Sequence, residues 1–366
     1  MKVLTVVGAR PQFIKAAVVS RAIADRNLGA PEPVIREVLV HTGQHFDSNM
    51  SQSFFDELSI PQPAHHLQIH GGGHGQMTGR MLEHLERTME AERPDWVLIY
   101  GDTNSTLAGA LAAVKLHIPV AHVEAGLRSF NMRMPEEINR VVADRVSTLL
   151  FCPTDAAVSN LRLEGITRGV HNVGDVMYDA ALLYSDLAGR RSTSALSRFS
   201  VERGGYVLAT CHRAENTDDS GRLAEILAGL GRLARSWPVL LPLHPRTAKV
   251  LEREGLAVAS GVRLLEPLSF LDMIELERHA RLIVTDSGGV QKEAYFYGVP
   301  CITTRDETEW VETVVAGWNR LTGADQKRIA EAAERFQQEG GLRERPEFYG
   351  DGHSGRRIVE KLLASL

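Results

Sequence analysis

The chain has 366 residues, of which 43% are hydrophobic and 24% are charged, and these values predict two globular domains that each bury a core of their own. The formal net charge of -5 excludes proteins that bind nucleic acid or anionic membranes through overall basicity, so an anion-binding site must be local. We therefore expect no nucleic-acid partner and no membrane partner.

The cysteines are few and widely spaced. Cys152, Cys211 and Cys301 form no CxxC pair, so neither a disulfide framework nor a thiolate zinc site is indicated. We expect no bound metal and a reducing, cytoplasmic location. The apolar stretch from Val3 to Val7 is too short for a signal sequence or a membrane-spanning helix.

Short β-branched runs alternate with helical patterns in both halves of the chain, as in βαβ units on a parallel sheet. The first half contains the runs 3–7, 38–40, 96–100 and 120–123, with helical segments at 79–90 and 107–116 between them. The second half contains the runs 206–210, 239–243, 281–285 and 299–302. The sequence predicts an α/β protein with two Rossmann-like domains.

The domain boundary is predicted near the polar stretch 189–194, which precedes the first strand of the second half. We expect residues 1–178 to form the first domain and residues 179–352 the second. Residues 353–366 contain an amphipathic helical pattern and could pack back on the first domain.

The first loop with chemical potential follows the first predicted strand. Gly8 permits close approach of a ligand to the backbone, and Arg10 and Lys15 bring positive charge to the start of the next helix. An ordinary solvated helix start explains the same residues, and the loop by itself does not identify a ligand.

Three carboxylates follow successive strands or begin helices in the first half. Asp102 ends one strand, Glu124 ends the next, and Glu136 lies in the Pro-Glu-Glu segment soon afterwards. Such a cluster suits acid–base chemistry because like charges raise one another's pKa. Asp102 could instead cap the following helix, and the cluster could be an ion-pair network.

In the second half, His212 follows a strand and offers an imidazole that could change charge near neutral pH. A surface position or a helix cap explains it equally well. His244 and Arg246 form a similar but weaker pair, which could serve substrate binding or only loop structure.

The strongest phosphate-binding pattern is Ser287-Gly288-Gly289, which lies between a strand and a helix. Two glycines at a helix start expose backbone N–H groups to a diphosphate. Glu293 follows within the first turns, where its carboxylate could accept hydrogen bonds from ribose hydroxyls.

Six segments occur together along the chain: GARPQFIK (8–15), YGDTNST (100–106), HVEAGLR (122–128), PEEINR (135–140), CHRAEN (211–216) and TDSGGVQKEA (285–294). Jointly they resemble the non-hydrolysing UDP-N-acetylglucosamine 2-epimerases. This resemblance implies a glycosyltransferase-B-like fold with an active site in the interdomain cleft, a homodimer, a UDP-sugar substrate and no cofactor. It also implies that UDP is eliminated across C1 and C2 to give a 2-acetamidoglucal and is then added back.

The resemblance assigns catalytic roles to Asp102, Glu124, Glu136 and His212, without resolving which group serves each side of C2. It assigns diphosphate binding to Arg10, Lys15, His212 and the 287–289 loop, and ribose binding to Glu293. Arg305 is a further predicted substrate-binding residue. Phe270 or Met273 would flank the uracil, although both are also plausible core residues.

Two segments depart from the common family pattern. Residues 46–49 and the glycine-rich loop 71–75 differ from those that bind a second, activating UDP-sugar, so we expect hyperbolic kinetics without such activation. Trp310-Val311 replaces the usual Arg-Pro, which, with Ala9 and Gln12, resembles the branch acting on UDP-2,3-diacetamido-2,3-dideoxyglucuronic acid. A UDP-sugar glycosyltransferase, a UDP-sugar sensor and a hydrolysing epimerase are the competing interpretations.

Overall fold

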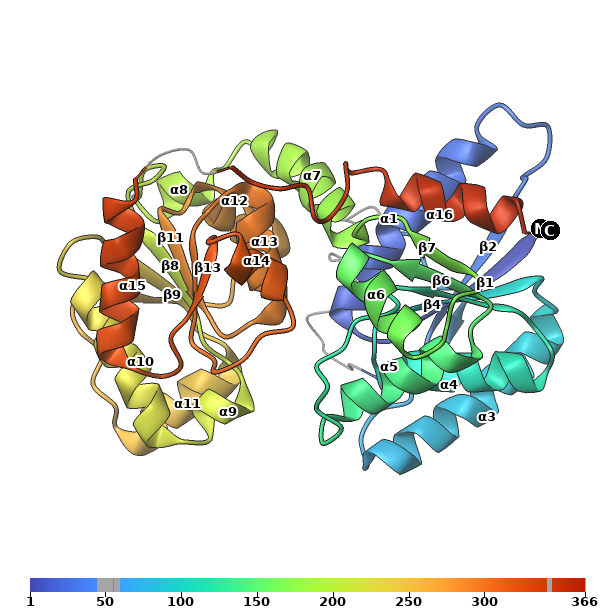
Figure 1. Cartoon of the computed structure of the whole chain (residues 1–366), viewed down its shortest axis with the longest axis horizontal. Coiled ribbons are helices and arrows are strands. Elements are labelled where there is room, and N and C mark those ends of the chain that lie inside the picture. Colours follow the sequence, from blue (N-terminus) through green and yellow to red (C-terminus); the bar gives the residue numbers. More distant parts are fainter. Residues whose placement is uncertain (45–54, 56–59, 341–343, 366) are drawn as a thin grey trace. The chain divides into compact units, whose positions relative to one another are not determined.

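The computed structural model describes residues 1–44, 55, 60–340 and 344–365. These residues form two compact units: the first comprises residues 1–180 and 347–366, and the second comprises residues 181–346. Helix α7 (Val176–Gly189) contains the point where the chain passes from the first unit to the second. Each unit is described by itself (Figure 1).

The first unit is built on a seven-stranded sheet, in the order β3-β2-β1-β4-β5-β6-β7, and every neighbouring pair is parallel. Its strands are β1 (Lys2–Val7), β2 (Arg36–His41), β3 (His65–His66), β4 (Trp96–Tyr100), β5 (Val120–Val123), β6 (Leu149–Cys152) and β7 (Val170–Asn172). Its helices are α1 (Arg10–Asn27), α3 (His74–Glu92), α4 (Asn104–Lys115), α5 (Pro135–Val146), α6 (Asp155–Leu163) and α16 (Ser354–Leu363).

The strands of the first unit are nearly continuous apolar runs because helices cover both faces of the sheet. Leu4, Val6, Val97 and Ile99 of β1 and β4 pack with residues of α3, α4 and α5 into one core. Helices α1 and α16 pack against each other on the opposite side (Figure 1). The last helix therefore belongs to the core of the first unit.

The second unit has a six-stranded parallel sheet, in the order β10-β9-β8-β11-β12-β13. Its strands are β8 (Val207–Thr210), β9 (Val239–Pro242), β10 (Val262–Leu265), β11 (Leu282–Thr285), β12 (Cys301–Thr303) and β13 (Asn319–Leu321). Its helices are α8 (Ala195–Arg198), α9 (Ala214–Thr217), α10 (Ser220–Leu233), α11 (Pro245–Glu254), α12 (Phe270–His279), α13 (Gly288–Tyr297), α14 (Val311–Val315) and α15 (Gln326–Gln338).

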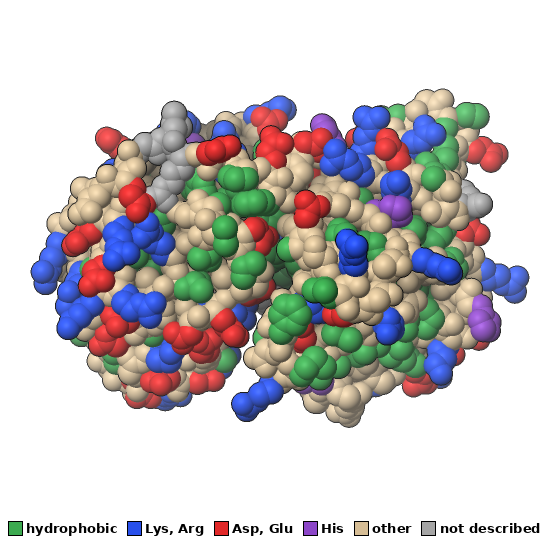
Figure 2. All heavy atoms as spheres, viewed as in Figure 1, with side chains coloured by type: hydrophobic (Ala, Val, Ile, Leu, Met, Phe, Trp, Pro, Cys, Tyr) green, Lys and Arg blue, Asp and Glu red, His purple; other side chains and the backbone are tan. Residues whose placement is uncertain are grey.

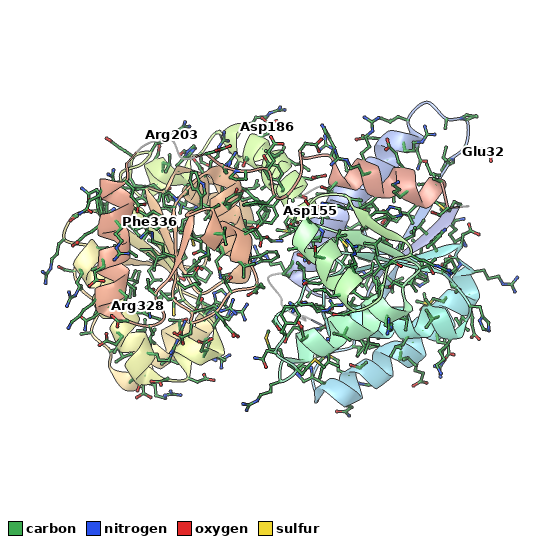
Figure 3. The ribbon with its side chains drawn as sticks, in the orientation of Figure 1. Glu32, Asp155, Asp186, Arg203, Arg328 and Phe336 are labelled. Atoms are coloured by element: carbon green, nitrogen blue, oxygen red, sulfur yellow. The ribbon has the colours of Figure 1, made fainter. Side chains whose placement is uncertain are left out.

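Two apolar cores cover the two faces of this second sheet. One contains residues of α10, α11 and α15, including Phe336, which Figure 3 labels on α15 together with Arg328. The other contains residues of α8, α12 and α13. On the face of each unit visible in Figure 2, acidic and basic side chains are interspersed. The prediction of two parallel α/β domains is confirmed.

In both sheets the chain order reverses between two adjacent central strands, β1 and β4 in the first unit and β8 and β11 in the second. Ligands of open α/β sheets bind beyond the carboxyl ends of the strands at such a reversal. We therefore expect the functional residues in the loops that follow these strands.

Candidate active site

Gly8 follows β1 in a tightly packed position of the first unit. A Cβ atom there would lie 2.1 Å from Ser105 Oγ and 2.2 Å from Thr42 Oγ1, so no larger residue fits. The backbone N–H groups of Gly8 and Ala9 donate to Gln12 Oε1, at 2.8 and 3.0 Å. Close packing therefore requires a glycine at this position.

Gln12 connects the first loop to the end of β4. Its Nε2 donates to the Tyr100 carbonyl at 2.7 Å and to Thr106 Oγ1 at 3.0 Å. The amide supplies one acceptor and one donor to a buried site, which a carboxylate would not do. The residue that marks a branch of the family thus has a structural function here.

Lys15 and Glu124 form a mostly buried ion pair next to Gly101. A Cβ atom at Gly101 would lie 3.3 Å from Glu124 Oε2 and 3.4 Å from Lys15 Nζ. The structure thus brings together two predicted site residues that are 109 positions apart. Arg10, in contrast, is exposed at the first residue of α1.

Asp102 pairs with Arg140, whose Nη2 donates to Asp102 Oδ2 at 2.5 Å. Burial raises the pKa of Asp102, with a smaller contribution from Glu124, while Arg140 and Lys15 oppose the increase. A carboxyl group with a raised pKa is suited to proton transfer. The alternative that Asp102 caps α4 is wrong, because Thr103 is the N-cap and its side chain accepts from Thr106 N.

Glu136 and Glu137 differ sharply, although they are neighbours at the start of α5. Glu137 is buried and accepts from the backbone N–H groups of Ser129 and Phe130, both at 2.9 Å, and from Arg140 at 2.8 Å. Burial raises the pKa of Glu137, but these hydrogen bonds outweigh burial and lower it. Glu136 is partly exposed and has no hydrogen-bond or ion-pair partner among the described residues.

Arg140 is a functional candidate that the sequence analysis did not select. It connects Asp102 to Glu137, and its guanidinium is largely buried. Its position one helical turn after the two glutamates of PEEINR is the signal that could have identified it, since residues three and four apart share a helix face.

In the second unit, Asp286 organises the loop that carries His212. Its buried carboxylate accepts from the backbone N–H groups of His212 and Arg213, each at 3.0 Å, and from Asn216 Nδ2 at 3.2 Å. The His212 ring lies 5.4 Å from that of His244. Burial lowers the pKa of His212, and His244 and Arg213 add to this effect against Asp286. The lowered pKa favours the neutral form of the His212 ring at pH 7.

His244 and Arg246 have the structural functions that were left open. His244 is the N-cap of α11, and its Nδ1 accepts from Arg246 N at 3.1 Å. The Arg246 guanidinium binds both oxygens of Asp218, at 2.7 and 2.9 Å. His212 is not a helix cap, because Arg213 occupies the N-cap position of α9.

Helix α13 begins with two glycines in different surroundings. Ser287 is the N-cap and accepts from Val290 N. A Cβ atom at Gly288 would lie 2.8 Å from Glu309 Oε1, whereas one at Gly289 would meet only Ser287 Oγ, at 3.8 Å. Gly289 is exposed and Glu293 is partly buried one turn later. The first turn thus offers backbone N–H groups to an anion.

Arg305 lies behind this helix start. It is buried, and its Nη1 donates to Glu309 Oε2 at 2.9 Å, while Arg213 Nη2 lies 3.8 Å from Glu309 Oε1. Lys292 Nζ lies 4.1 Å from the centre of the Trp310 ring, a cation–π contact. The unusual Trp310 thus contacts a cation of α13.

The two uracil candidates lie on α12. Phe270 is its first residue, and its ring contacts that of Tyr184 edge-on at 5.4 Å. Met273 packs against the core shared by α8, α12 and α13. Both side chains are partly buried, and both make packing contacts.

The loops expected to differ from an activating site are partly described. Residues 45–49 lie outside the described residues. In the glycine-rich loop, Arg80 Nη2 donates to the carbonyls of His70 and Gly71, at 3.0 and 2.6 Å. Residues 71–75 include no Lys or Arg, but Arg80 of α3 supplies a basic side chain to this loop, which the sequence analysis did not predict.

Among the described residues, no group of three or more His, Cys, Asp or Glu side chains could hold a metal ion. No helix within the described ranges is long and apolar enough to cross a membrane.

Each unit has a parallel sheet in which the chain order reverses between two central strands. At the strand ends, the first unit has carboxylates paired with basic side chains, and the second has a helix that begins with glycines. These features define a two-domain enzyme of glycosyltransferase-B-like fold. The sequence profile of the UDP-N-acetylglucosamine 2-epimerases matches residues 30–363. The chain belongs to this family of isomerases.

Individual relatives cover the whole chain. It is 53% identical to the UDP-2,3-diacetamido-2,3-dideoxy-D-glucuronate 2-epimerase of Pseudomonas aeruginosa, over 99% of both chains. It is similar to the Methanocaldococcus jannaschii UDP-GlcNAc 2-epimerase in complex with UDP-GlcNAc and UDP, with 41% identity, a TM-score of 0.89 and full coverage of both chains. The Neisseria meningitidis enzyme bound to UDP-GlcNAc gives 30% identity, a TM-score of 0.88 and full coverage of both.

Proposed function

We propose that this epimerase inverts C2 of UDP-2,3-diacetamido-2,3-dideoxy-D-glucuronate. The observation that carries the proposal is the 53% identity over 99% of both chains to an enzyme named for that substrate. Trp310-Val311, which replaces the usual Arg-Pro of the family, also supports this substrate. Lys292 of α13 lies against the Trp310 ring, near the proposed phosphate-binding end of the second unit. UDP-N-acetylglucosamine is the second candidate, favoured by the 41% identical M. jannaschii relative.

In the proposed reaction, a base removes the C2 proton and UDP leaves from C1 with the electron pair of the C1–O bond. The resulting 2-acetamidoglucal takes a proton on the opposite side of C2, and UDP adds back to C1. No hydride is transferred, so nicotinamide is not required. Two acid–base groups and a site for the departing diphosphate suffice.

The proposal assigns proton transfer to Asp102, Glu124 and Glu136 of the first unit and to His212 of the second. Support comes from the raised pKa of Asp102, from the Lys15–Glu124 pair beside it and from the lowered pKa of His212. Which group serves each side of C2 is left open.

The proposal assigns the diphosphate to the start of α13 (Ser287, Gly288 and Gly289) together with Arg10 and Lys15. Glu293 would bind the ribose, Arg305 would hold Glu309 in place, and Phe270 would flank the uracil. The open surface at Gly289 supports this assignment because a phosphate can approach its N–H. We further propose a homodimer in the cytoplasm.

The deciding experiment incubates the protein separately with the two UDP-sugars in deuterated water and follows C2 by NMR. We expect faster turnover of the diacetamido-uronate, with deuterium at C2 of the product. Faster turnover of UDP-N-acetylglucosamine would make it the substrate. Epimerised product without deuterium would overturn the elimination mechanism.

The same reactions separate the competing functions. A glycosyltransferase would need an acceptor, a sensor would leave the sugar unchanged, and a hydrolysing epimerase would release free sugar. We also expect hyperbolic rate curves, and reverse epimerisation without priming by the glucose-configured sugar. A sigmoidal curve would show that a second UDP-sugar site operates.

A further inference from the structure

His122 of β5 is fully buried, and both of its ring nitrogens are engaged. Nδ1 lies 2.7 Å from Asp144 Oδ1, and Nε2 lies 2.7 Å from the Gly101 carbonyl oxygen. Each ring nitrogen therefore faces an oxygen atom, and the two contacts together fix the orientation of the ring.

Asp144 of α5 joins His122 to a closed group of polar side chains. Besides His122, its carboxylate accepts from Arg128 Nη1 at 2.7 Å and from Gly126 N at 3.0 Å. Burial raises the pKa of Asp144, but His122 and Arg128 outweigh burial and lower it. Arg128 also binds both oxygens of Glu164, at 2.6 and 2.9 Å. The cluster thus joins the His122 ring and the Arg128 guanidinium to the Asp144 and Glu164 carboxylates.

The group contacts the backbone on both sides of the proposed catalytic pair. His122 holds the carbonyl of Gly101, whose peptide bond leads directly to Asp102. Asp144 holds the N–H of Gly126, two residues after Glu124. One rigid cluster therefore connects the loop of Asp102 to the loop of Glu124.

Glu124 needs such support because its backbone is strained. Its φ of 71° lies in the left-handed region, which a residue with a side chain adopts only where the surroundings impose it. The Glu124 and Ala125 N–H groups donate to the Phe151 carbonyl, at 3.0 and 3.1 Å. The position of the Glu124 carboxylate thus depends on a backbone that its neighbours hold in place.

We propose that His122, Asp144 and Arg128 are positioning residues, which fix the Asp102 and Glu124 carboxylates relative to each other for proton transfer at C2. The inference rests on the proposed roles of Asp102 and Glu124. None of the three residues needs to touch the substrate. Small displacements of a reacting group cost large factors in rate, so the effect should appear in turnover.

The test compares His122→Gln and Arg128→Lys with wild type, the second variant being milder because it keeps the cation. His65→Gln is the matched control, since His65 forms a histidine–carboxylate contact of 2.8 Å with Glu92 elsewhere in the first unit. Melting curves and UDP binding by calorimetry show which variants are folded. We expect His122→Gln to lower kcat by about tenfold to a hundredfold, and Arg128→Lys to have a smaller effect. UDP affinity should stay within about twofold in both, and His65→Gln should match wild type.

A kcat of folded His122→Gln equal to that of wild type would overturn the inference, as would a loss of UDP affinity by the same factor as kcat. Crystal structures of the same variants give a readout that does not need turnover. We expect the 101–102 peptide and the Glu124 side chain to move in His122→Gln. Unchanged positions would overturn the positioning role whatever the activity, whereas absence of C2 exchange by wild type would overturn only the proposed function.

Discussion

The strand ends of the two units use charge differently. In the first unit, charged side chains pair with one another, as in Lys15–Glu124 and Arg140–Asp102. In the second unit, the Asp286 carboxylate is bound mainly by backbone N–H groups, the lowered pKa of His212 favours its neutral form, and α13 begins with glycines. Paired carboxylates can exchange protons, whereas free N–H groups at a helix start bind anions. The proposed roles follow this difference, with proton transfer mainly in the first unit and anion binding mainly in the second.

The largest expected effect tests the proton-transfer task of the first unit. Glu124→Gln should lower kcat by about a hundredfold or more, because an amide cannot take the C2 proton. Asp102→Asn and Glu136→Gln, in the same unit, and His212→Asn, in the second unit, should lower kcat on the same scale. Turnover followed by NMR measures kcat. Calorimetry measures UDP affinity, which we expect to be unchanged in the three carboxylate variants.

The exposed Glu83 provides the control, since its ion pair with Arg87 lies on the surface. Glu83→Gln should retain full activity. If Glu124→Gln weakens UDP binding but leaves kcat intact, the division of tasks between the units is wrong.

The next effect concerns the stability of the first unit. Gln12→Glu replaces the amide donor to the Tyr100 carbonyl with an acceptor, so two buried acceptors face each other, although the carbonyl keeps its bond from Thr106 Oγ1 at 2.6 Å. We expect a loss of about 2 kcal/mol, within the usual cost of an unsatisfied buried polar group. Hydrogen exchange at the amides of β1 and β4 measures it. The exposed Gln76→Glu is the control, and equal protection in both variants would contradict this function of Gln12.

A smaller effect should appear at the anion-binding end of the second unit. Gly289→Ala fits the fold, because the nearest atom to the added Cβ is 3.8 Å away, but the methyl group would obstruct a phosphate. We expect UDP affinity to fall about tenfold, the loss of one good hydrogen bond to a charged group, without a change in melting temperature. Calorimetry with UDP tests this expectation.

Gly75→Ala is matched to Gly289→Ala, since Gly75 is also the second residue of a helix and has no atom within 4 Å of an added Cβ. UDP should bind this variant normally. If Gly289→Ala binds UDP as tightly as wild type, the proposal that the diphosphate binds at the start of α13 is wrong.

The last expected effect is a pH dependence of the stability of the first unit. Burial, with His66 nearby, lowers the pKa of His41 from 6.5 to about 4. Between these values the unfolded chain binds a proton that the folded chain does not. The free energy of unfolding should therefore fall as the pH drops from 6.5 to 4, by at most about 1.4 kcal/mol per pH unit. His41→Phe should flatten this part of the curve of melting temperature against pH, and an unchanged slope would contradict the assignment.

The sequence predicted the central strands well because their signal is local. Runs 96–100 and 120–123 coincide with β4 and β5, and three runs in the second half differ from β8, β9 and β11 by one residue at one end. The fourth, 299–302, begins two residues before β12 and ends one residue before it ends. Edge strands such as β3 and β7 were not predicted, because they have only two or three residues and are partly exposed. Apolar periodicity gives no signal in so short a segment.

The sequence alone determined the two parallel α/β halves, the glycine-started helix and the family, since each depends on residues close together along the chain. Only the tertiary structure decided the fate of individual polar residues. Glu136 and Glu137 are adjacent, yet only Glu137 is buried and bound, because consecutive helix residues point about 100° apart. The Lys15–Glu124 and His122–Asp144 pairs join residues 109 and 22 positions apart. Such pairs depend on how strands and helices pack, which no local pattern specifies.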